Sequence, residues 1–384
     1  MDDATEDCRA TEDCWATADS RAAADSRGRL GWRVPYLTGD LPGIGGVIRN
    51  EPEDFVVEEV PAYEPCGDGE HTYFRVEKRG ISTMQLVKEI AAKLDLPPRA
   101  ISYAGLKDAH AVARQTFSAQ FVPEDRIEGL SLESARILWV SRHRNKLRVG
   151  HLRGNRFTVR IRDVVPDAAT RAAVILEELT RHGVPNAYGP QRFGKRGDNA
   201  VAGYHLLRHD RAALQTMGIH HLSQNLHGLF LSALQSALFN QVVARRISDG
   251  TLDTVILGDV ARKEDTGGIF IVADLDTDQA RAHAWEISPT GPIYGYKMME
   301  AHAAAGEIEH QVLSEAGLSL ADFRPVKESG VRRPLRYRPV GLTCYSDGAN
   351  HLVVSFFAPK GSFATALLGE LMKTEAAPHA DLAD

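Results

Sequence analysis

The sequence predicts an α+β fold that is interrupted by an inserted, mostly helical domain. Segments with the two-residue period of strands occupy much of 43–162, the stretch from 183 to about 338 is mainly helical, and strand patterns return at 341–346 and 351–359. The last strands would complete the sheet that the first ones begin. A chain of 384 residues with 43% hydrophobic and 25% charged residues suits two or three globular domains and disfavours a disordered or collagen-like chain.

The first part of the chain alternates strands with helices. Strand patterns are expected at 43–50, 54–60, 72–78, 101–105, 114–122, 136–140 and 156–162. Ser82 is a good N-cap for a helix over 83–94, whose apolar residues share one face, and Pro97 and Pro98 end it. A second helix is expected over about 168–182, closed by Gly183.

The rest of the chain contains one clear long helix and one short final helix. The long helix is expected over 228–247, and the last helix over about 362–373. The sheet domain would therefore combine 40–182 with 339–376, the inserted domain would span 183–338, and 377–384 would form a frayed C-terminus.

Residues 1–27 have a composition unlike the rest of the chain. They hold eight acids and three arginines, and both TEDC and ADSR occur twice. Such a segment buries little apolar surface, so we expect 1–39 to be a disordered acidic tail and a lead-in. The chain carries a formal net charge of −6, but the remaining 43 acids and 42 bases leave 28–384 close to neutral. The net charge therefore does not exclude a nucleic-acid partner.

Targeting, metal and cofactor motifs do not occur in the sequence. The N-terminus has no basic start followed by an apolar run, and no stretch approaches 18 uninterrupted apolar residues. The cysteines at 8, 14, 66 and 344 form no CxxC pair, and the histidines do not group as ligands. No P-loop, Rossmann fingerprint or GxSxG elbow is present. We expect a cytoplasmic protein without a metal or cofactor, and nothing demands more than a monomer.

The strongest local signal is AGLKDAHAVARQ at 104–115. A strand ends near Gly105, so Lys107 and Asp108 lie in a loop at its end, where rigid scaffolds present reactive groups. A nearby ammonium favours the ionised carboxylate, which can act as a nucleophile or as a base. The alternative is an ordinary surface turn.

A second signal is a basic stretch at 141–162, which holds eight bases and no acid: Arg142, Arg144, Lys146, Arg148, Arg153, Arg156, Arg160 and Arg162. Such a concentration of positive charge suits binding of a phosphate backbone. A hairpin here could present both these bases and the ring of Phe157 to a nucleic acid. The alternative is a solvated strand face. Further bases at the two ends of the inserted domain would fit a cleft for a polyanion: Arg192, Lys195, Arg196, Arg324, Lys327, Arg332, Arg333, Arg336 and Arg338.

The sequence resembles the TruD family of tRNA pseudouridine synthases over roughly 41–376. The resemblance rests on segments that occur in the family's order: PEDFVVEE at 52–59, AGLKDAHAVARQ at 104–115, RHRNKLRVGHLRGNRF at 142–157, GVPNAYGPQRFG at 183–194, SALFNQVVARR at 236–246 and APKGSFATALLGEL at 358–371. It implies a pseudouridine synthase-like catalytic domain on a mixed, largely antiparallel sheet, with an inserted TRUD domain. It also implies transfer RNA as partner, with uridine 13 as the usual bacterial target.

The resemblance also assigns roles to residues of this chain. The family's catalytic aspartate falls on Asp108. Lys107 matches a basic neighbour of the active site that contributes to substrate binding. Positions that surround the target nucleotide fall on Phe55, Asn155, Phe157 and Phe363. The basic residues expected to bind RNA are Arg142, Arg144, Lys146, Arg148 and Arg192.

The implied reaction breaks the N1–C1′ bond of uridine and rejoins the base through C5, so it needs no redox step or cofactor. A carboxylate could attack C1′ or the base, or remove the 2′ proton, and the sequence does not choose between these routes. The nucleotide must be flipped out of its stack, and aromatic rings replace the lost stacking. A non-catalytic RNA-binding or RNA-folding protein would use the same bases but leave Lys107 and Asp108 unexplained. A carboxylate-dependent hydrolase of small nucleotides would bind with little dependence on salt.

Overall fold

The computed structural model describes residues 30–348 and 350–374. Of the tail and lead-in expected over 1–39, residues 1–29 lie outside these ranges, as does the frayed end expected over 377–384. The described chain divides into two compact units. The first holds the described residues up to Pro35 together with Ala187–Leu335, and the second holds Tyr36–Asn186 together with the described residues from Arg336 onward.

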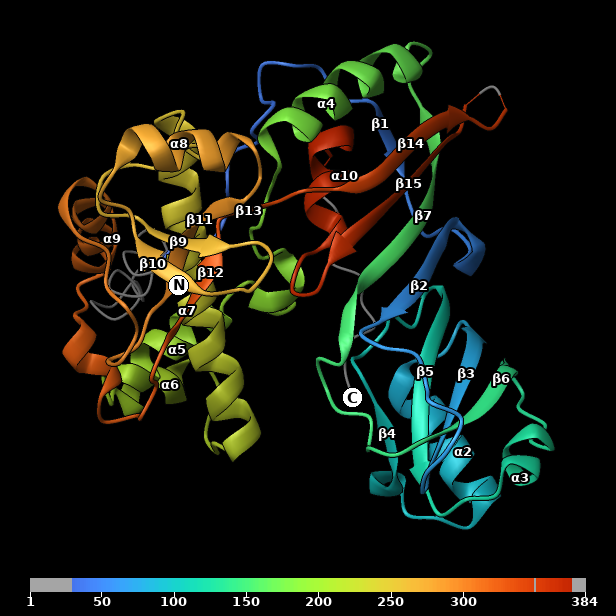
Figure 1. Ribbon diagram of the computed structural model, residues 1–384. Coiled ribbons are helices and arrows are strands. Elements are labelled where there is room, and N and C mark those ends of the chain that lie inside the picture. Colours follow the sequence, from blue (N-terminus) through green and yellow to red (C-terminus); the bar gives the residue numbers. More distant parts are fainter. Residues whose placement is uncertain (1–29, 349, 375–384) are drawn as a thin grey trace, which may run out of the picture. The chain divides into compact units, whose positions relative to one another are not determined.

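A large sheet forms the centre of the second unit. Its strand order is β14-β15-β7-β2-β5-β3-β6, with β1 beside β7 and β4 beside β5 (Figure 1). The bounds are Gly45–Val47 (β1), Phe55–Pro61 (β2), His71–Arg79 (β3), Ile101–Tyr103 (β4), Val112–Gln120 (β5), Ala135–His143 (β6), Leu152–Val164 (β7), Val340–Ser346 (β14) and Leu352–Pro359 (β15). Strands β2 and β5 are parallel and the other pairs are antiparallel. The mixed, largely antiparallel sheet is thus confirmed, and the last strands complete it.

Helices cover this sheet with the apolar faces that the sequence predicts. The bounds are Thr83–Leu94 (α2), Glu124–Glu128 (α3), Ala168–His182 (α4) and Ala364–Met372 (α10), with 3-10 turns at Pro52–Asp54 (η1) and Pro98–Ala100 (η2). Helix α2 begins in a capping box, because Ser82 Oγ accepts from Gln85 N while Gln85 Oε1 accepts from Ser82 N. Its apolar face packs on β3 and β5, whereas α4 and α10 share the core on β7 and β15.

The first unit is mainly helical but also holds a four-stranded sheet in the order β10-β9-β11-β12. Its strands are Val260–Lys263 (β9), Ile269–Ile271 (β10), Ile287–Ile293 (β11) and Val331–Pro334 (β12). Its helices are Asn199–Leu207 (α5), Arg211–Thr216 (α6), Gln224–Ser248 (α7), Leu275–His283 (α8) and Ala303–Glu315 (α9), with 3-10 turns Pro190–Phe193 (η3) and Leu320–Phe323 (η4). The expected helix over 228–247 lies within α7. The sheet was not predicted, because ISPTGPI and VRRP carry proline or charge instead of alternating apolar residues.

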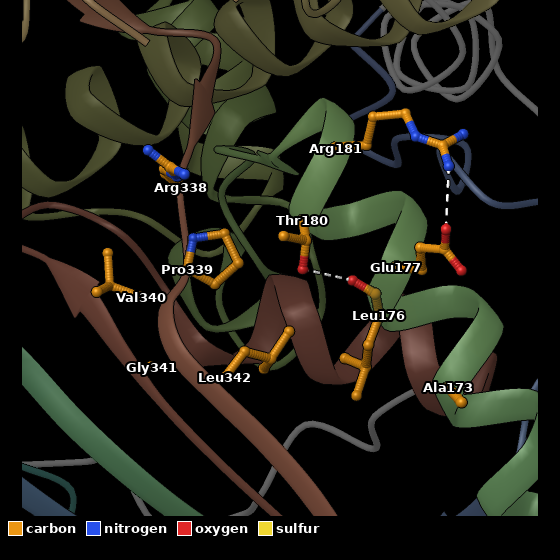
Figure 2. Close-up of a pocket in the computed structure, with 10 residues that line it drawn as sticks. All are labelled: Ala173, Leu176, Glu177, Thr180, Arg181, Arg338, Pro339, Val340, Gly341 and Leu342. Atoms are coloured by element: carbon orange, nitrogen blue, oxygen red, sulfur yellow. Dashed lines mark hydrogen bonds and ion pairs between the residues drawn. The ribbon is translucent and has the colours of Figure 1, made fainter. Parts of the chain in front are cut away.

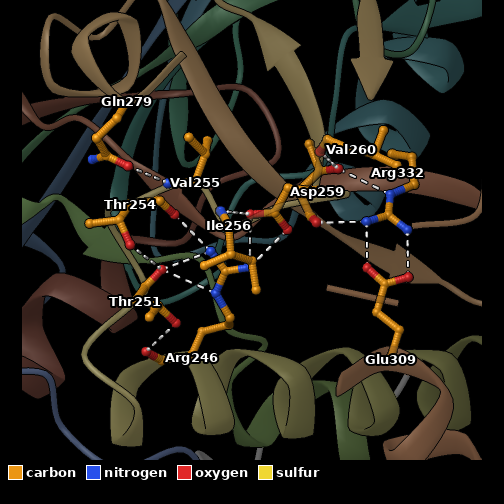
Figure 3. Close-up of polar contacts among 11 residues, drawn as sticks. Arg246, Thr251, Thr254, Val255, Ile256, Asp259, Val260, Gln279, Glu309 and Arg332 are labelled. Atoms are coloured by element: carbon orange, nitrogen blue, oxygen red, sulfur yellow. Dashed lines mark hydrogen bonds and ion pairs between the residues drawn. The ribbon is translucent and has the colours of Figure 1, made fainter. Parts of the chain in front are cut away.

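Two buried ion pairs link this small sheet and the residue before it to α7 and α9. Arg246 of α7 is 2% exposed and donates to the Asp259 carboxylate at 2.8 Å and to the carbonyls of Thr251 and Thr254 (Figure 3). Arg332 of β12 pairs with Glu309 at 2.6 Å and is 1% exposed. The prediction that Arg332 offers charge to a polyanion is therefore wrong, because this side chain is buried and ion-paired with Glu309.

Arg336 is also buried, at 2% exposure, and donates to the His182 carbonyl at 2.9 Å. It lies in β13 (Arg336–Tyr337), which pairs with β8 (Val184–Pro185) in the second unit. Arg336 therefore holds two chain segments together and does not face a surface cleft.

The expected basic hairpin over 141–162 does not form. Strand β6 lies at one edge beside β3, whereas β7 lies between β15 and β2, so three strands separate them. The connection 144–151 is long enough to cross this distance, and strand order is fixed by pairing partners that local periodicity does not reveal. The alternation within β7 itself is confirmed, because Phe157, Val159 and Ile161 are all buried.

Candidate active site

Asp108 lies in the loop 104–111 between the paired strands β4 and β5. Its carboxylate is 21% exposed, and Oδ2 lies 2.6 Å from Nη2 of Arg49. Its other oxygen, Oδ1, accepts from His110 N at 3.2 Å, which closes a local turn. Asp108 is thus an ion-paired carboxylate in a defined orientation that solvent, or a substrate, still reaches.

Arg49 lies just beyond β1 and was not identified from the sequence. Its side chain is 7% exposed, and its guanidinium lies 4.3 Å from the ring centroid of Phe55. Burial lowers the pKa of Arg49, and the Asp108 carboxylate opposes that effect. Arg49 therefore joins the aromatic residue of the EDF segment to the carboxylate of the LKD segment.

Lys107 is directed away from solvent. Its Nζ lies 2.6 Å from Glu59 Oε2, and the two side chains are 5% and 1% exposed. Glu59 Oε1 also accepts from Thr116 N at 3.2 Å, and Lys107 N donates to Thr83 Oγ1 at 2.9 Å. Lys107 therefore fastens its loop to β2, and Glu59 was also missed by the sequence analysis.

Lys78 of β3 is the third basic group beside Asp108. It is 0% exposed and donates to the Asp108 carbonyl at 2.6 Å and to the Ile81 carbonyl at 2.5 Å. Burial lowers the pKa of Lys78 to about 8, with Asp108 opposing this effect and Lys107 adding to it.

A sequence signal existed for both missed residues on the strands. Lys78 points to the same face of β3 as Phe74 and Val76. Glu59 points to the same face of β2 as Phe55 and Val57. Residues two apart share a face of a strand, so each charge falls on an apolar face, and a buried charge is informative. Arg49 follows a short strand and carries no such signal.

The predicted aromatic and amide positions gather on the central strands. Phe55 and Phe157 pack edge to face at 5.9 Å, and Phe157 also stacks on Phe356 at 5.4 Å, so both rings are largely covered here. Asn155 of β7 lies opposite Glu59 in the register, and its Oδ1 is buried without a hydrogen-bond partner among the described residues.

Phe363 precedes α10 and is 37% exposed, while its carbonyl accepts from Tyr337 Oη at 3.0 Å. It follows β15, which approaches β7 so closely that a Cβ on Gly154 would lie 2.2 Å from the Ala358 carbonyl oxygen. Only glycine therefore fits at position 154, directly before Asn155.

The predicted RNA-binding bases separate into distinct places. Arg142 pairs with Glu124 at 3.0 Å and Arg144 with Asp68 at 2.8 Å, both at the β6 edge. Lys146 and Arg148 make no ion pair within the described ranges, and their connection reaches the start of the Asp108 loop, where Gly150 N donates to the Ala104 carbonyl at 2.7 Å.

Arg192 lies in the other unit, in η3, and its Nε donates to Ser236 Oγ at 3.1 Å. Its guanidinium lies 5.5 Å from the ring centroid of Tyr188. This base is therefore held in place by contacts within its own unit.

A wide groove of about 810 Å³ opens elsewhere in the second unit, between α4 and the start of β14 (Figure 2). Leu176, Pro339 and Leu342 contribute apolar surface, and Arg181 and Arg338 flank it. None of its lining residues belongs to the Asp108 loop, so the groove is a separate feature.

Comparisons with known proteins cover nearly the whole described chain. The family model for tRNA pseudouridine synthase D (TruD) matches residues 32–218 and 211–371. A Thermus thermophilus protein of that name is 45% identical over 348 residues, which is 90% of this chain and 94% of the relative. A Geobacter sulfurreducens protein of the same name is 39% identical over 398 residues, covering 88% and 96%.

A similar fold occurs in the crystal structure of the Methanosarcina mazei protein assigned to tRNA pseudouridine synthase D. It superposes with a TM-score of 0.75 at 25% identity and covers 91% of this chain and 98% of the other. Among the helices of the described ranges, none is long and apolar enough to cross a membrane.

Proposed function

The chain belongs to the TruD family of tRNA pseudouridine synthases, and from this premise we propose that it isomerises uridine 13 of transfer RNA with Asp108 as the essential carboxylate. The observation that carries the proposal is the ion pair of Asp108 with Arg49, which presents a partly exposed carboxylate at the end of a rigid sheet. Such an oriented, charged group is what nucleophilic or base catalysis requires.

The reaction conserves mass and needs only proton transfers beside the bond exchange. The N1–C1′ bond breaks, a C5–C1′ bond forms, C5 loses its proton and N1 gains one. Asp108 acts on C1′, on the base or on the 2′ proton, and each route begins with an ionised carboxylate at this position.

The residues around Asp108 suit a flipped nucleotide. Phe55, Phe157 and Phe363 supply aromatic surface, and stacking on such rings is worth about 1–3 kcal/mol per base. The unpartnered Oδ1 of Asn155 is an acceptor for an N–H or hydroxyl of the substrate. In this proposal the rings of Phe55 and Phe157, which are 2% and 8% exposed, are uncovered when the nucleotide enters, whereas Phe363 is already 37% exposed.

We assign catalysis to 40–182 with 339–376, and an RNA-binding role to the inserted TRUD domain at 183–338. The division of the described chain near Tyr36, Asn186 and Arg336 supports this assignment. Lys146, Arg148 and Arg192 are the first candidates for phosphate contacts, with Arg142 and Arg144 beyond them. In this proposal the protein acts as a cytoplasmic monomer, which light scattering of the purified protein tests for the oligomeric state.

The direct test compares Asp108→Asn with Asp95→Asn in a tRNA modification assay. Asp95 is an exposed helix C-cap residue with φ of 58°, a conformation that asparagine also tolerates, so it controls for the same chemical change. We expect Asp108→Asn to bind tRNA nearly as the parent does and to form no pseudouridine. Binding by the parent without any product would instead indicate a non-catalytic RNA-binding protein.

A further inference from the structure

Lys78 is a charged residue on the core-facing side of β3, where apolar residues are usual. Phe74 and Val76, its neighbours on the same face of β3, belong to the core that α2 covers. The Lys78 side chain is fully buried, and it makes no ion pair within the described part of the chain. Burying an ammonium without a carboxylate is unfavourable unless its hydrogen bonds are satisfied, so its contacts need an explanation.

Those contacts are two backbone carbonyls from different segments. Nζ donates to Ile81, which lies just before the N-cap of α2, and to Asp108, in the loop 104–111. The distances of 2.5 and 2.6 Å place Nζ in direct hydrogen-bond contact with both carbonyl oxygens, and hydrogen bonds from a charged donor are stronger than neutral ones. Lys78 therefore ties the peptide group of Asp108 to the turn that connects β3 with α2.

The same turn holds the loop at flanking positions. Thr83 Oγ1 accepts from Lys107 N at 2.9 Å, and Gly80 N donates to the Ala111 carbonyl at 3.2 Å. Lys78 supplies the one contact in this series that reaches Asp108 itself. Anchoring this carbonyl restrains the backbone of residue 108, and with it the position of the Cα–Cβ bond from which the carboxylate extends.

We propose that Lys78 is a positioning residue for the reaction, holding the Asp108 peptide so that its carboxylate meets Arg49 and faces the substrate. This inference rests on the proposed role of Asp108. Lys78 does not touch the substrate; it acts through the backbone of the reacting residue. Misplacement of a reacting group by about 1 Å can lower a rate by about 100-fold, so the loss should appear in the chemical step.

The test measures single-turnover rates and tRNA affinity for Lys78→Met, Lys78→Arg and a matched control, Lys373→Met. Lys373 is another largely buried lysine of the same unit, and its Nζ contacts Thr38 Oγ1 at 2.6 Å and Glu370 at 3.0 Å, away from the loop. We expect Lys78→Met to lower the rate about 10- to 100-fold with the Kd within about threefold. Lys78→Arg should recover part of the rate, because guanidinium also donates to carbonyls, and Lys373→Met should retain it.

A rate for folded Lys78→Met within twofold of the parent would overturn the inference, as would a loss confined to tRNA affinity. If Lys78→Met does not fold, Lys78→Gln, a shorter neutral donor that cannot span both carbonyls, is measured in its place, and a rate within twofold of the parent would also overturn the inference. A parent protein that forms no pseudouridine would instead refute the proposed function, so the two failures are distinguishable.

Discussion

Removing the charge of Glu59 should destabilise the second unit far more than removing the charge of its neighbour Glu58. Glu59 and Lys107 are 1% and 5% exposed and lie 2.6 Å apart. At that separation, with an effective dielectric constant of about 20, their attraction is about 6 kcal/mol. Much of this only offsets the desolvation of the pair, but Glu59→Gln leaves the Lys107 ammonium buried and uncompensated. We therefore expect a loss of about 3–5 kcal/mol.

The matched control is Glu58→Gln on the same strand. Glu58 is 34% exposed and pairs with Arg75 at 3.2 Å and with Arg156 at 3.6 Å, so its loss should cost about 1 kcal/mol or less. Glu59→Gln combined with Lys107→Met removes both charges and should be less destabilising than either single change.

Urea unfolding followed by fluorine NMR of 5-fluorotryptophan measures these differences. Trp139 of β6 packs beside Tyr73 and Leu147, so its signal reports on the second unit, while Trp32 and Trp285 report on the first. Equal losses for Glu59→Gln and Glu58→Gln, or strict additivity in the double variant, would refute the argument that this ion pair is buried and coupled.

Three further outcomes are expected elsewhere in the chain. Arg49→Met should lower pseudouridine formation about 100-fold with little change in tRNA affinity, because it releases the Asp108 carboxylate, and rate and binding assays measure both quantities. Burial lowers the pKa of His71 and of His143 below 6.5, so the unfolded chain binds more protons in acid and Tm should fall as pH drops from 7 to 5, less so when both are replaced by Gln. Deleting residues 1–27, which carry eight acids and three arginines, should keep activity and strengthen RNA binding at low salt; loss of activity would contradict this.

The local elements could be predicted because each has its own periodic signal. The helix over 83–94 has a capping residue and one apolar face, and β7 alternates over 156–162, so both agree with the structure. Strand β11 could not be predicted, because it is buried on both faces and contains two prolines and a glycine. Its pairing partners, which lie far away in the chain, determine its conformation.

The candidate site was predicted in part for a similar reason. Asp108 lies in a strand-end loop whose sequence resembles a known family, so the sequence identifies it. Arg49 contacts Asp108 only because β1 and the loop 104–111 are brought together by the sheet, and no local pattern marks that contact. Lys78 and Glu59 could have been found by asking why charges occupy apolar strand faces.

We propose that the Asp108 carboxylate performs the isomerisation of a tRNA uridine. The measurement that tests it most directly is chemical mapping of pseudouridine in tRNA after incubation with the parent protein, with Asp108→Asn and with Asp95→Asn. We predict pseudouridine at position 13 with the parent and with Asp95→Asn, and none with Asp108→Asn despite retained tRNA binding. Pseudouridine formed by Asp108→Asn at the parental rate would contradict the claim.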